Sequence, residues 1–180
     1  MSKKVLIIST SVRNNSNSEA LANAFAEGAR EAGNEVETVS LQGKTIAFCK
    51  GCLACQKAGH CVIQDDANAI TEKMLGAEVI VWATPIYYYE MSGQMKTMID
   101  RANSLYSRDY KFRDVYLLST ATEDEATTDE GALRGMNGWV ACFERARFAG
   151  KVFAGGVTTP GEIAGHKALA EARAMGRAIA

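Results

Sequence analysis

Five short apolar runs divide the chain, and segments with helical periodicity separate them. Four of these runs, residues 5–9, 79–83, 115–120 and 152–157, do not alternate strictly between apolar and polar side chains. That pattern is typical of strands buried on both faces of a parallel sheet. The fifth run, residues 35–41, alternates imperfectly and predicts an edge strand.

Helices are predicted between and after these strands, because apolar residues recur there at every third or fourth position. The predicted helices span residues 18–32, 67–75, 93–105, 130–148 and 165–180. Strict alternation of strands and helices implies right-handed crossovers and helices on both faces of a doubly wound sheet. The fold class is therefore α/β, with a flavodoxin-like five-stranded parallel sheet in the order 2-1-3-4-5.

The predicted strand order also indicates where a ligand binds. In sheets of this order, ligands lie at the carboxyl ends of the strands, at the point where the order reverses. The loops after strands one, three and four must then all carry ligand chemistry.

The composition is that of an ordinary globular protein, with 180 residues of which 47% are hydrophobic and 23% charged. We expect residues 1–180 to form a single domain. A net charge of −1 favours neither nucleic acid nor an anionic membrane as a partner, and no apolar run is long enough to span a bilayer. Residues 1–4 lead directly into the first predicted strand, so we expect no signal peptide and a cytoplasmic location.

The loop after the first strand is rich in hydrogen-bond donors. Ser11, Arg13, Ser16, Asn17 and Ser18 lie between a buried strand and a predicted helix N-terminus, which offers unpaired N–H groups and partial positive charge to an anion. The loop contains no glycine, which excludes the dinucleotide fingerprint and the nucleoside triphosphate loop. Many hydroxyls and one cation favour a phosphate monoester such as that of flavin mononucleotide (FMN). The alternative is an ordinary turn that caps its helix.

The loop after the third strand supplies flat apolar surfaces. Pro85 restricts the backbone before three consecutive tyrosines, residues 87–89. Backbone amides of such a loop can reach the rim of an isoalloxazine ring while a tyrosine covers part of its face. The alternative is an aromatic patch that packs on another subunit. Thr120 and Ala121 begin the loop after the fourth strand and are predicted to contact the same cofactor.

Other occupants of this fold are excluded by the same loops. A phosphorelay receiver needs an acidic pair after the first strand, where this chain has Ser9 and Thr10. A small tyrosine phosphatase needs a cysteine that opens the first loop, but no cysteine precedes Cys49. A flavodoxin that only carries electrons is usually strongly acidic, and this chain is nearly neutral.

Four cysteines lie in the long loop between the second strand and the second helix: Cys49, Cys52, Cys55 and Cys61. Their compact spacing, with two residues between the first three, favours ligation of a [4Fe–4S] cluster. A structural zinc site is a rival interpretation, and free thiols beside the flavin are a third. Cys142 lies on the apolar stripe of the fourth predicted helix and is expected in the core.

Five titratable residues at three places in the chain are expected to have structural roles. Asp65 and Asp66 resemble the start of a helix. Asp100 and Arg101 are read as polar-face or subunit-contact residues, and His166 as a capping or surface residue at the last helix.

Taken together, these motifs resemble the flavodoxin-fold NADPH-dependent FMN reductase family, and in particular the branch that includes the iron–sulfur flavoproteins. The resemblance extends over the whole chain. It is carried by SVRNNSNS at 11–18, CKGCLAC at 49–55, GHCVIQDD at 59–66, TPIYY at 84–88, MSGQMK at 91–96, Asp100-Arg101 and GEI at 161–163. Three departures stand out: Ser9-Thr10 replaces a common glycine, Val12 replaces a common proline, and Tyr89 stands where a small residue or a different aromatic is often found.

The resemblance implies roles for individual residues. The FMN phosphate is held by Ser11, Arg13, Ser16, Asn17 and Ser18. The isoalloxazine is lined by Pro85, Ile86, Tyr87 and Tyr88, with Met91 and Ser92 near the flavin or a dimer contact. The chemistry belongs to the flavin, so no catalytic side chain is expected.

The implied activity is that of an FMN-dependent NAD(P)H oxidoreductase, which passes electrons from a reduced nicotinamide to a small acceptor such as a quinone or a flavin. The alternative is an iron–sulfur flavoprotein that carries electrons between a ferredoxin-like protein and an acceptor. A third class is a thiol- or zinc-based sensor that has lost FMN. A homodimer or homotetramer is expected.

Overall fold

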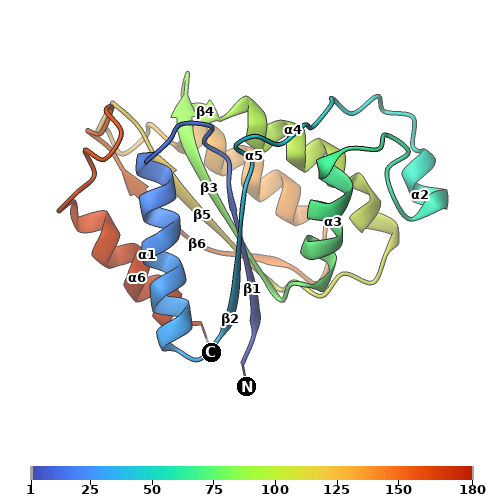
Figure 1. Ribbon diagram of the computed structural model, residues 1–180, viewed down its shortest axis with the longest axis horizontal. Helices are drawn as coiled ribbons and strands as arrows, with labels where there is room; N and C mark the ends of the chain where they lie inside the picture. The colour runs from blue at the N-terminus through green and yellow to red at the C-terminus, as the bar shows by residue number, and fades with distance from the viewer. Residues whose placement is uncertain (1, 180) are drawn as a thin grey trace.

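A computed structural model describes residues 2–179 of the chain. Five parallel strands form the central sheet in the order β2-β1-β3-β5-β6 (Figure 1). They are β1 (Lys4–Ser9), β2 (Glu35–Ser40), β3 (Val79–Tyr87), β5 (Asp114–Thr120) and β6 (Arg147–Ala154). The two-residue strand β4 (Glu90–Met91) pairs antiparallel with the end of β3. Leaving β4 aside, the predicted order 2-1-3-4-5 is confirmed, with the predicted edge strand at β2.

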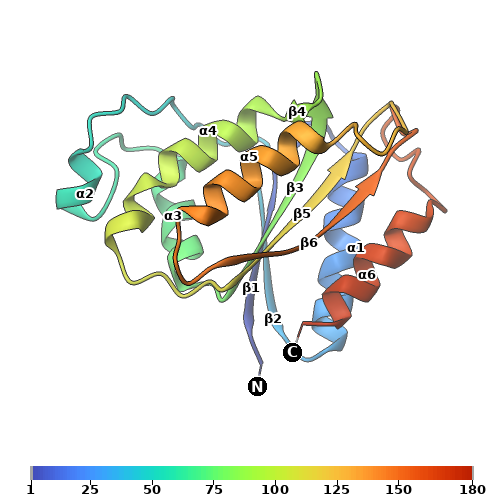
Figure 2. The same cartoon turned by 180° about the vertical axis from the view of Figure 1, so that it is seen from behind.

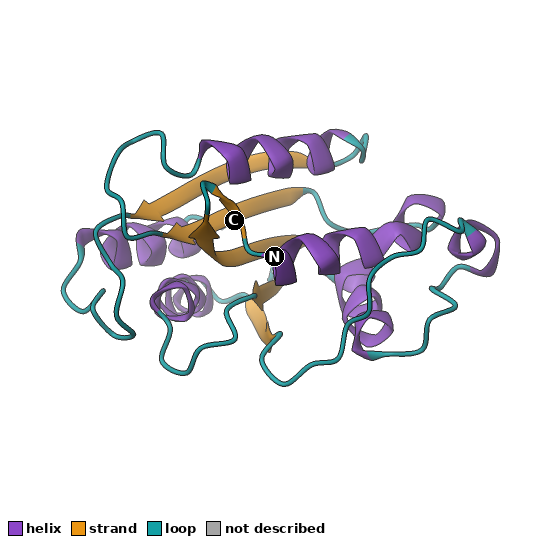
Figure 3. Ribbon diagram, turned by 90° about the horizontal axis from the view of Figure 1, so that it is seen from above, coloured by secondary structure: helices purple, strands orange, loops and turns teal. Residues whose placement is uncertain are grey.

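Helices cover both faces of this sheet, as Figures 1 and 2 show from opposite sides and Figure 3 from above. One face carries α1 (Asn17–Glu31) and α6 (Lys167–Arg177). The other carries α3 (Asp66–Gly76), α4 (Gly93–Arg101) and α5 (Glu130–Ala141). A short helix, α2 (Ala54–Ala58), lies in the cysteine loop away from the sheet, and a 3₁₀ helix, η1 (Ala102–Ser107), continues α4.

The core has two halves, because successive side chains of a strand point to opposite faces of the sheet. In β1, Leu6 and Ile8 pack beneath α3 and α4, while Val5 and Ile7 pack beneath α1 and α6. All four are at most 2% exposed, as expected for a strand covered on both sides. Burial of each such side chain stabilises the fold by roughly 1.5–3 kcal/mol.

The predicted helix over residues 130–148 is wrong in its last third. The helix α5 ends at Ala141, and β6 begins at Arg147, earlier than the predicted strand over 152–157. Phe143 continues the helical spacing of Met136 and Val140, but it packs in an aromatic cluster with Tyr110, Phe112 and Trp139. Phe148 lies outside that spacing and belongs to β6, where it pairs with β5.

Three further sequence expectations are settled by the fold. Cys142 is exposed at the end of α5, so its predicted place in the core is wrong. Asp65 caps α3 and His166 caps α6, each accepting a hydrogen bond from a backbone N–H, as predicted. Met1 and Ala180, which belong to the predicted N-terminal lead and last helix, lie outside the described residues. Over residues 2–179, no helix has the length and apolar character that a membrane span requires.

Candidate functional site

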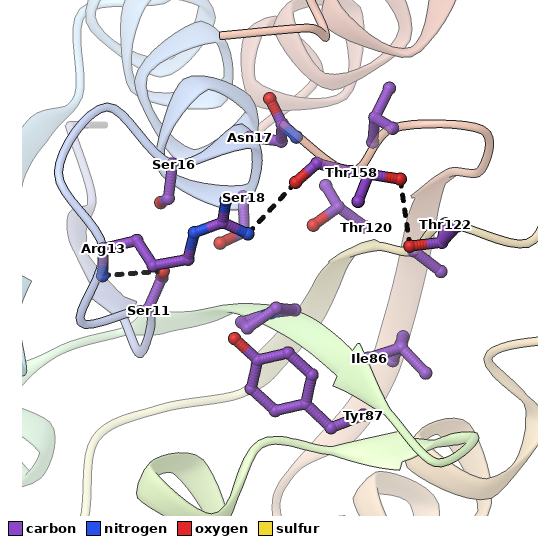
Figure 4. A pocket seen from close by; sticks show the side chains of 13 residues that line it. Ser11, Arg13, Ser16, Asn17, Ser18, Ile86, Tyr87, Thr120, Thr122 and Thr158 are labelled. Atoms are coloured by element: carbon purple, nitrogen blue, oxygen red, sulfur yellow. Dashed lines mark hydrogen bonds between the residues drawn. The ribbon is translucent and has the colours of Figure 1, made fainter. Parts of the chain in front are cut away.

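A cavity opens at the carboxyl edge of the sheet, where four chain segments meet (Figure 4). The loops after β1 and β5 and the last residues of β3 contribute three walls, as the strand order predicts. The fourth wall comes from the loop after β6. The lining residues are Ser11, Arg13, Ser16, Asn17, Ser18, Pro85, Ile86, Tyr87, Thr120, Ala121, Thr122, Val157 and Thr158.

The N-terminus of α1 forms the polar end of this cavity. Ser16 is the N-cap residue, and its hydroxyl accepts a hydrogen bond from the N–H of Glu19. Ser18 Oγ is buried and has no hydrogen-bond partner within residues 2–179. A buried hydroxyl without a partner is unfavourable by roughly 1–3 kcal/mol. A phosphate oxygen at the helix end would satisfy this hydroxyl together with the free N–H groups of the first turn.

Arg13 extends across the mouth of the cavity. Its Nη1 donates to the carbonyl oxygen of Thr158 at 3.0 Å. Thr158 in turn donates its hydroxyl to Thr122 at 3.1 Å, which joins the loops after β6 and β5. Figure 4 shows this connection running from the α1 side to the β5 side. The guanidinium is therefore held beside the serine-rich end, where it adds one positive charge.

The end of β3 supplies the apolar wall. The strand continues through Pro85 to Tyr87, beyond its predicted end at residue 83, and Pro85 pairs with Thr120 of β5. Tyr88 and Tyr89 both have positive φ, 50° and 65°, and form a two-residue turn into β4. Tyr88 is fully exposed and does not line the cavity.

Met91 and Ser92 lie behind the cavity wall. Met91 is buried in the core beneath α5. Ser92 caps α4, and its hydroxyl lies 3.1 Å from that of Thr10 and accepts from Thr84 at 3.2 Å. These contacts hold the β3 loop against β1.

Ten of the thirteen predicted cofactor-binding residues therefore share one cavity, and Tyr88, Met91 and Ser92 do not line it. Sequence reasoning placed Thr122 in the loop after the fourth strand without giving it a role. It missed Val157 and Thr158 altogether. The signal that could have found them is the pair of polar residues directly after the last apolar run.

The cysteine loop does not form a metal site in the structure. Across residues 2–179, no three His, Cys, Asp or Glu side chains come together in a group able to hold a metal ion. Cys49 and Cys52 are exposed, whereas Cys55 and Cys61 are half-buried. All four are free thiols, and Cys55 Sγ accepts a hydrogen bond from the Asn103 side chain.

Arg101 anchors both ends of this loop, and its predicted surface role is wrong because it is only 2% exposed. Its guanidinium donates to the carbonyl oxygens of Ala47 and Ile63, before and after the cysteines, at 2.8 and 3.0 Å. It also makes a two-pronged ion pair with the Asp65 carboxylate. Burial alone would raise the pKa of Asp65, but hydrogen bonds from Arg101 and from the N–H groups of Ala47 and Ala67 outweigh it and lower that pKa.

Comparison with known proteins places these features in a family context. The sequence model of a family described as NADPH-dependent FMN reductase matches residues 3–136. An iron-sulfur flavoprotein of Methanosarcina thermophila is 36% identical over 111 residues, which cover 62% of this chain and 58% of that protein. Another, from Methanocaldococcus jannaschii, is 36% identical over 102 residues, covering 57% and 53% of the two chains. The matches thus span little more than half the length of these relatives.

The fold also matches solved structures over its full length. An NAD(P)H:quinone oxidoreductase from Methanothermobacter marburgensis superimposes with a TM-score of 0.73, covering 100% of both chains at 16% identity. At that identity the likeness shows the fold alone, and it confirms the flavodoxin-like arrangement predicted from the alternating strands and helices.

Proposed function

Because the chain belongs to the NADPH-dependent FMN reductase family, we propose that it binds FMN at the carboxyl edge of its sheet and passes electrons from NAD(P)H to a small acceptor, such as a quinone or a flavin. The observation that carries this proposal is the buried hydroxyl of Ser18, which has no partner within residues 2–179 and lines a cavity at a helix N-terminus. A serine-rich helix end of this kind suits the phosphate of FMN.

Different residues of the cavity would bind different parts of FMN. Ser11, Ser16, Ser18 and the first N–H groups of α1 would hold the phosphate, with Arg13 as the charged partner. Pro85, Ile86 and Tyr87 on one side and residues 120–122 on the other would flank the isoalloxazine and keep water from it. When bound, the flavin supplies the hydride and electron transfer chemistry.

Replacement of one hydroxyl tests the proposal. We expect Ser18→Ala to weaken FMN binding by about tenfold or more, because a hydrogen bond to a charged group contributes roughly 1.5–3 kcal/mol. Ser107→Ala is the matched control, since the Ser107 hydroxyl donates to the carbonyl oxygen of Ser104 at the end of η1, away from the cavity lining. Quenching of flavin fluorescence measures the dissociation constants.

Activity completes that test. The FMN-loaded protein should oxidise NADPH or NADH when a quinone is present, and Ser18→Ala should lose this activity at limiting FMN and regain it at saturating FMN. Failure of the wild-type protein to bind FMN would sink the proposed function. Binding without NAD(P)H oxidation would leave a flavoprotein that carries electrons for another protein.

A second copy of the chain is the partner we propose for the β3–β4 hairpin. Tyr87, Tyr88 and Tyr89 are 46%, 100% and 59% exposed beside the cavity, and apolar surface of this kind favours protein contact. Homodimer or homotetramer formation would cover these rings and place a second chain next to the flavin.

The cysteine segment supports a second candidate function, that of an iron–sulfur flavoprotein with a ferredoxin-like partner. Its support is the spacing of Cys49, Cys52, Cys55 and Cys61 and the similarity of the chain to iron-sulfur flavoproteins. The thiols as they lie do not fit a cluster, so we route no electron transfer through them. Iron and sulfide assays on protein purified without air decide this candidate: a [4Fe–4S] cluster predicts four of each per chain, and Cys52→Ser should abolish both. Metal-free protein with normal FMN content would reject it.

A further inference from the structure

The loop after β6, residues 157–163, closes the cavity and lies outside the segment that defines the family match. Val157 and Ile163 are buried at its two ends, 6% and 2% exposed. The N–H of Val157 donates to the carbonyl oxygen of Ala121 at 2.9 Å, which ties the loop to the end of β5. We refer to residues 157–163 as the closing loop.

The closing loop is stabilised internally by the side chain of Glu162. Glu162 Oε2 accepts hydrogen bonds from the backbone N–H groups of Thr158 and Thr159, at 2.7 and 2.8 Å. These two bonds lower the pKa of the exposed Glu162 carboxyl, so the group is ionised at neutral pH. Hydrogen bonds to an ionised acceptor are about twice as strong as neutral ones.

The same loop is also bound by Arg13 and Asn17, which line the polar end of the cavity. Arg13 Nη1 donates to the carbonyl oxygen of Thr158, and Asn17 Nδ2 donates to that of Thr159, each at 3.0 Å. Asn17 Oδ1 also accepts from the N–H of Ile163 at 3.3 Å. Asn17 thus contacts the closing loop at two points while it begins α1.

One peptide group connects the two sets of contacts. The Thr158–Thr159 peptide accepts from Arg13 through its oxygen and donates to Glu162 through its nitrogen. Hydrogen bonds in such a chain polarise one another. The carboxylate therefore strengthens the hydrogen bond between the Thr158 carbonyl and the Arg13 guanidinium. Both N–H groups donate to the same Glu162 oxygen, Oε2, so the carboxylate contacts the peptide that carries the Thr158 carbonyl.

Close packing supports this arrangement. Gly161 has a φ of 83°, and a Cβ there would lie 2.8 Å from the Asn15 side chain of the β1 loop. The closing loop and the loop after β1 therefore approach each other closely at this point, with the exposed Asn15 side chain beside Gly161.

We propose that Glu162 is a positioning residue for the FMN phosphate, acting through the Thr158–Thr159 peptide on Arg13 and through the closing loop on Asn17. The inference rests on the proposed function and deepens it. It predicts that Glu162 contributes to affinity for the phosphate of the flavin and not for its ring system.

Binding of FMN and of riboflavin, which lacks the phosphate, tests this role. We expect Glu162→Ala to weaken FMN binding about tenfold and to leave riboflavin binding unchanged. Glu162→Gln should recover part of the loss, because its amide oxygen still accepts from both N–H groups. Glu171→Ala, an exposed glutamate on α6, is the matched control and should leave both ligands unaffected.

A double variant tests the route. If Glu162 acts through Arg13, the combined Arg13→Ala and Glu162→Ala protein should lose less FMN affinity than the product of the two single losses. An equal loss for FMN and riboflavin, an unaffected FMN affinity or simple additivity would overturn the inference while leaving the proposed function intact. A wild-type protein that binds neither flavin would overturn both.

Discussion

At the scale of single residues, the ion pair between Arg101 and Asp65 shows most clearly what buried charge does in this protein. The Arg101 side chain is fully buried and that of Asp65 is 7% exposed. Replacing one partner of such a pair leaves the other charge buried without compensation. The main effect of the pair on stability is therefore that neither charge is left buried without a partner.

We expect Asp65→Asn to lower the free energy of unfolding by about 3 kcal/mol, which is typical for breaking a buried ion pair. Asp100→Asn is the matched control, because Asp100 makes an exposed pair with Lys96 that is worth less than about 0.5 kcal/mol. Urea denaturation of the two variants measures the difference. Equal stabilities would contradict the role given to Arg101.

The dependence of stability on pH follows from the same pair. The pKa of Asp65 in the folded protein is lower than its ordinary value of 3.8, so the ionised form is favoured by folding. Its contribution is complete above pH 3.8 and is lost as the pH falls through the folded pKa. Asp65→Asn should therefore show a smaller loss of stability than the wild type between neutral pH and about pH 3. Parallel pH profiles would argue against this assignment.

At the scale of elements, α1 and α6 approach each other at glycine. A Cβ on Gly28 would lie 1.9 Å from the carbonyl oxygen of Arg173, and one on Gly176 would lie 2.1 Å from that of Phe25. The two helices are also joined by Glu31, whose hydrogen bonds from Arg173 and Arg177 lower its pKa to about 2. Backbone contact at glycine, with ion pairs at the rim, fixes the spacing of this helix pair.

Alanine scanning of helical glycines tests that contact. Gly176→Ala should destabilise the protein by about 1–3 kcal/mol, because the added methyl overpacks the α1–α6 contact. Gly138→Ala in α5 should instead stabilise it by up to about 1 kcal/mol, since no atom lies near its Cβ and alanine favours helix. Thermal unfolding distinguishes the two signs, and stabilisation by both changes would refute the close approach.

Element boundaries also show where sequence patterns stop being informative. The strand at residues 5–9 and the helix at 67–75 agree with the structure within two residues, because short apolar runs and a capping aspartate mark them. The boundary between α5 and β6 was misplaced because Phe143 continues the apolar spacing of α5 although the helix ends at Ala141. The contact of Phe143 with Phe112 and the pairing of Phe148 with β5 decide the outcome, and neither is local.

At the scale of the whole molecule, the strand order explains why most of the site was predictable. It brings the ends of β1, β3 and β5 to one edge, and the serines, Pro85 and Thr120 were read from the loops there. The wall at residues 157–158 was missed because β6 lies at the far edge of the sheet. Its loop reaches the cavity through Arg13 and Asn17, which are contacts between residues more than a hundred positions apart.

The contacts of Arg101 with both ends of the cysteine loop affect the chemistry of the cysteines. Joining the ends of a flexible segment has an entropic cost that grows with its length. In the folded protein the ends of the cysteine loop are already joined, because one guanidinium binds the carbonyl oxygens of Ala47 and Ile63. The thiols between them are confined to a small volume, so each experiences the others at a high effective concentration. Capture of a ligand by more than one of these thiols therefore begins within a closed ring, whatever occupies the cavity at the edge of the sheet.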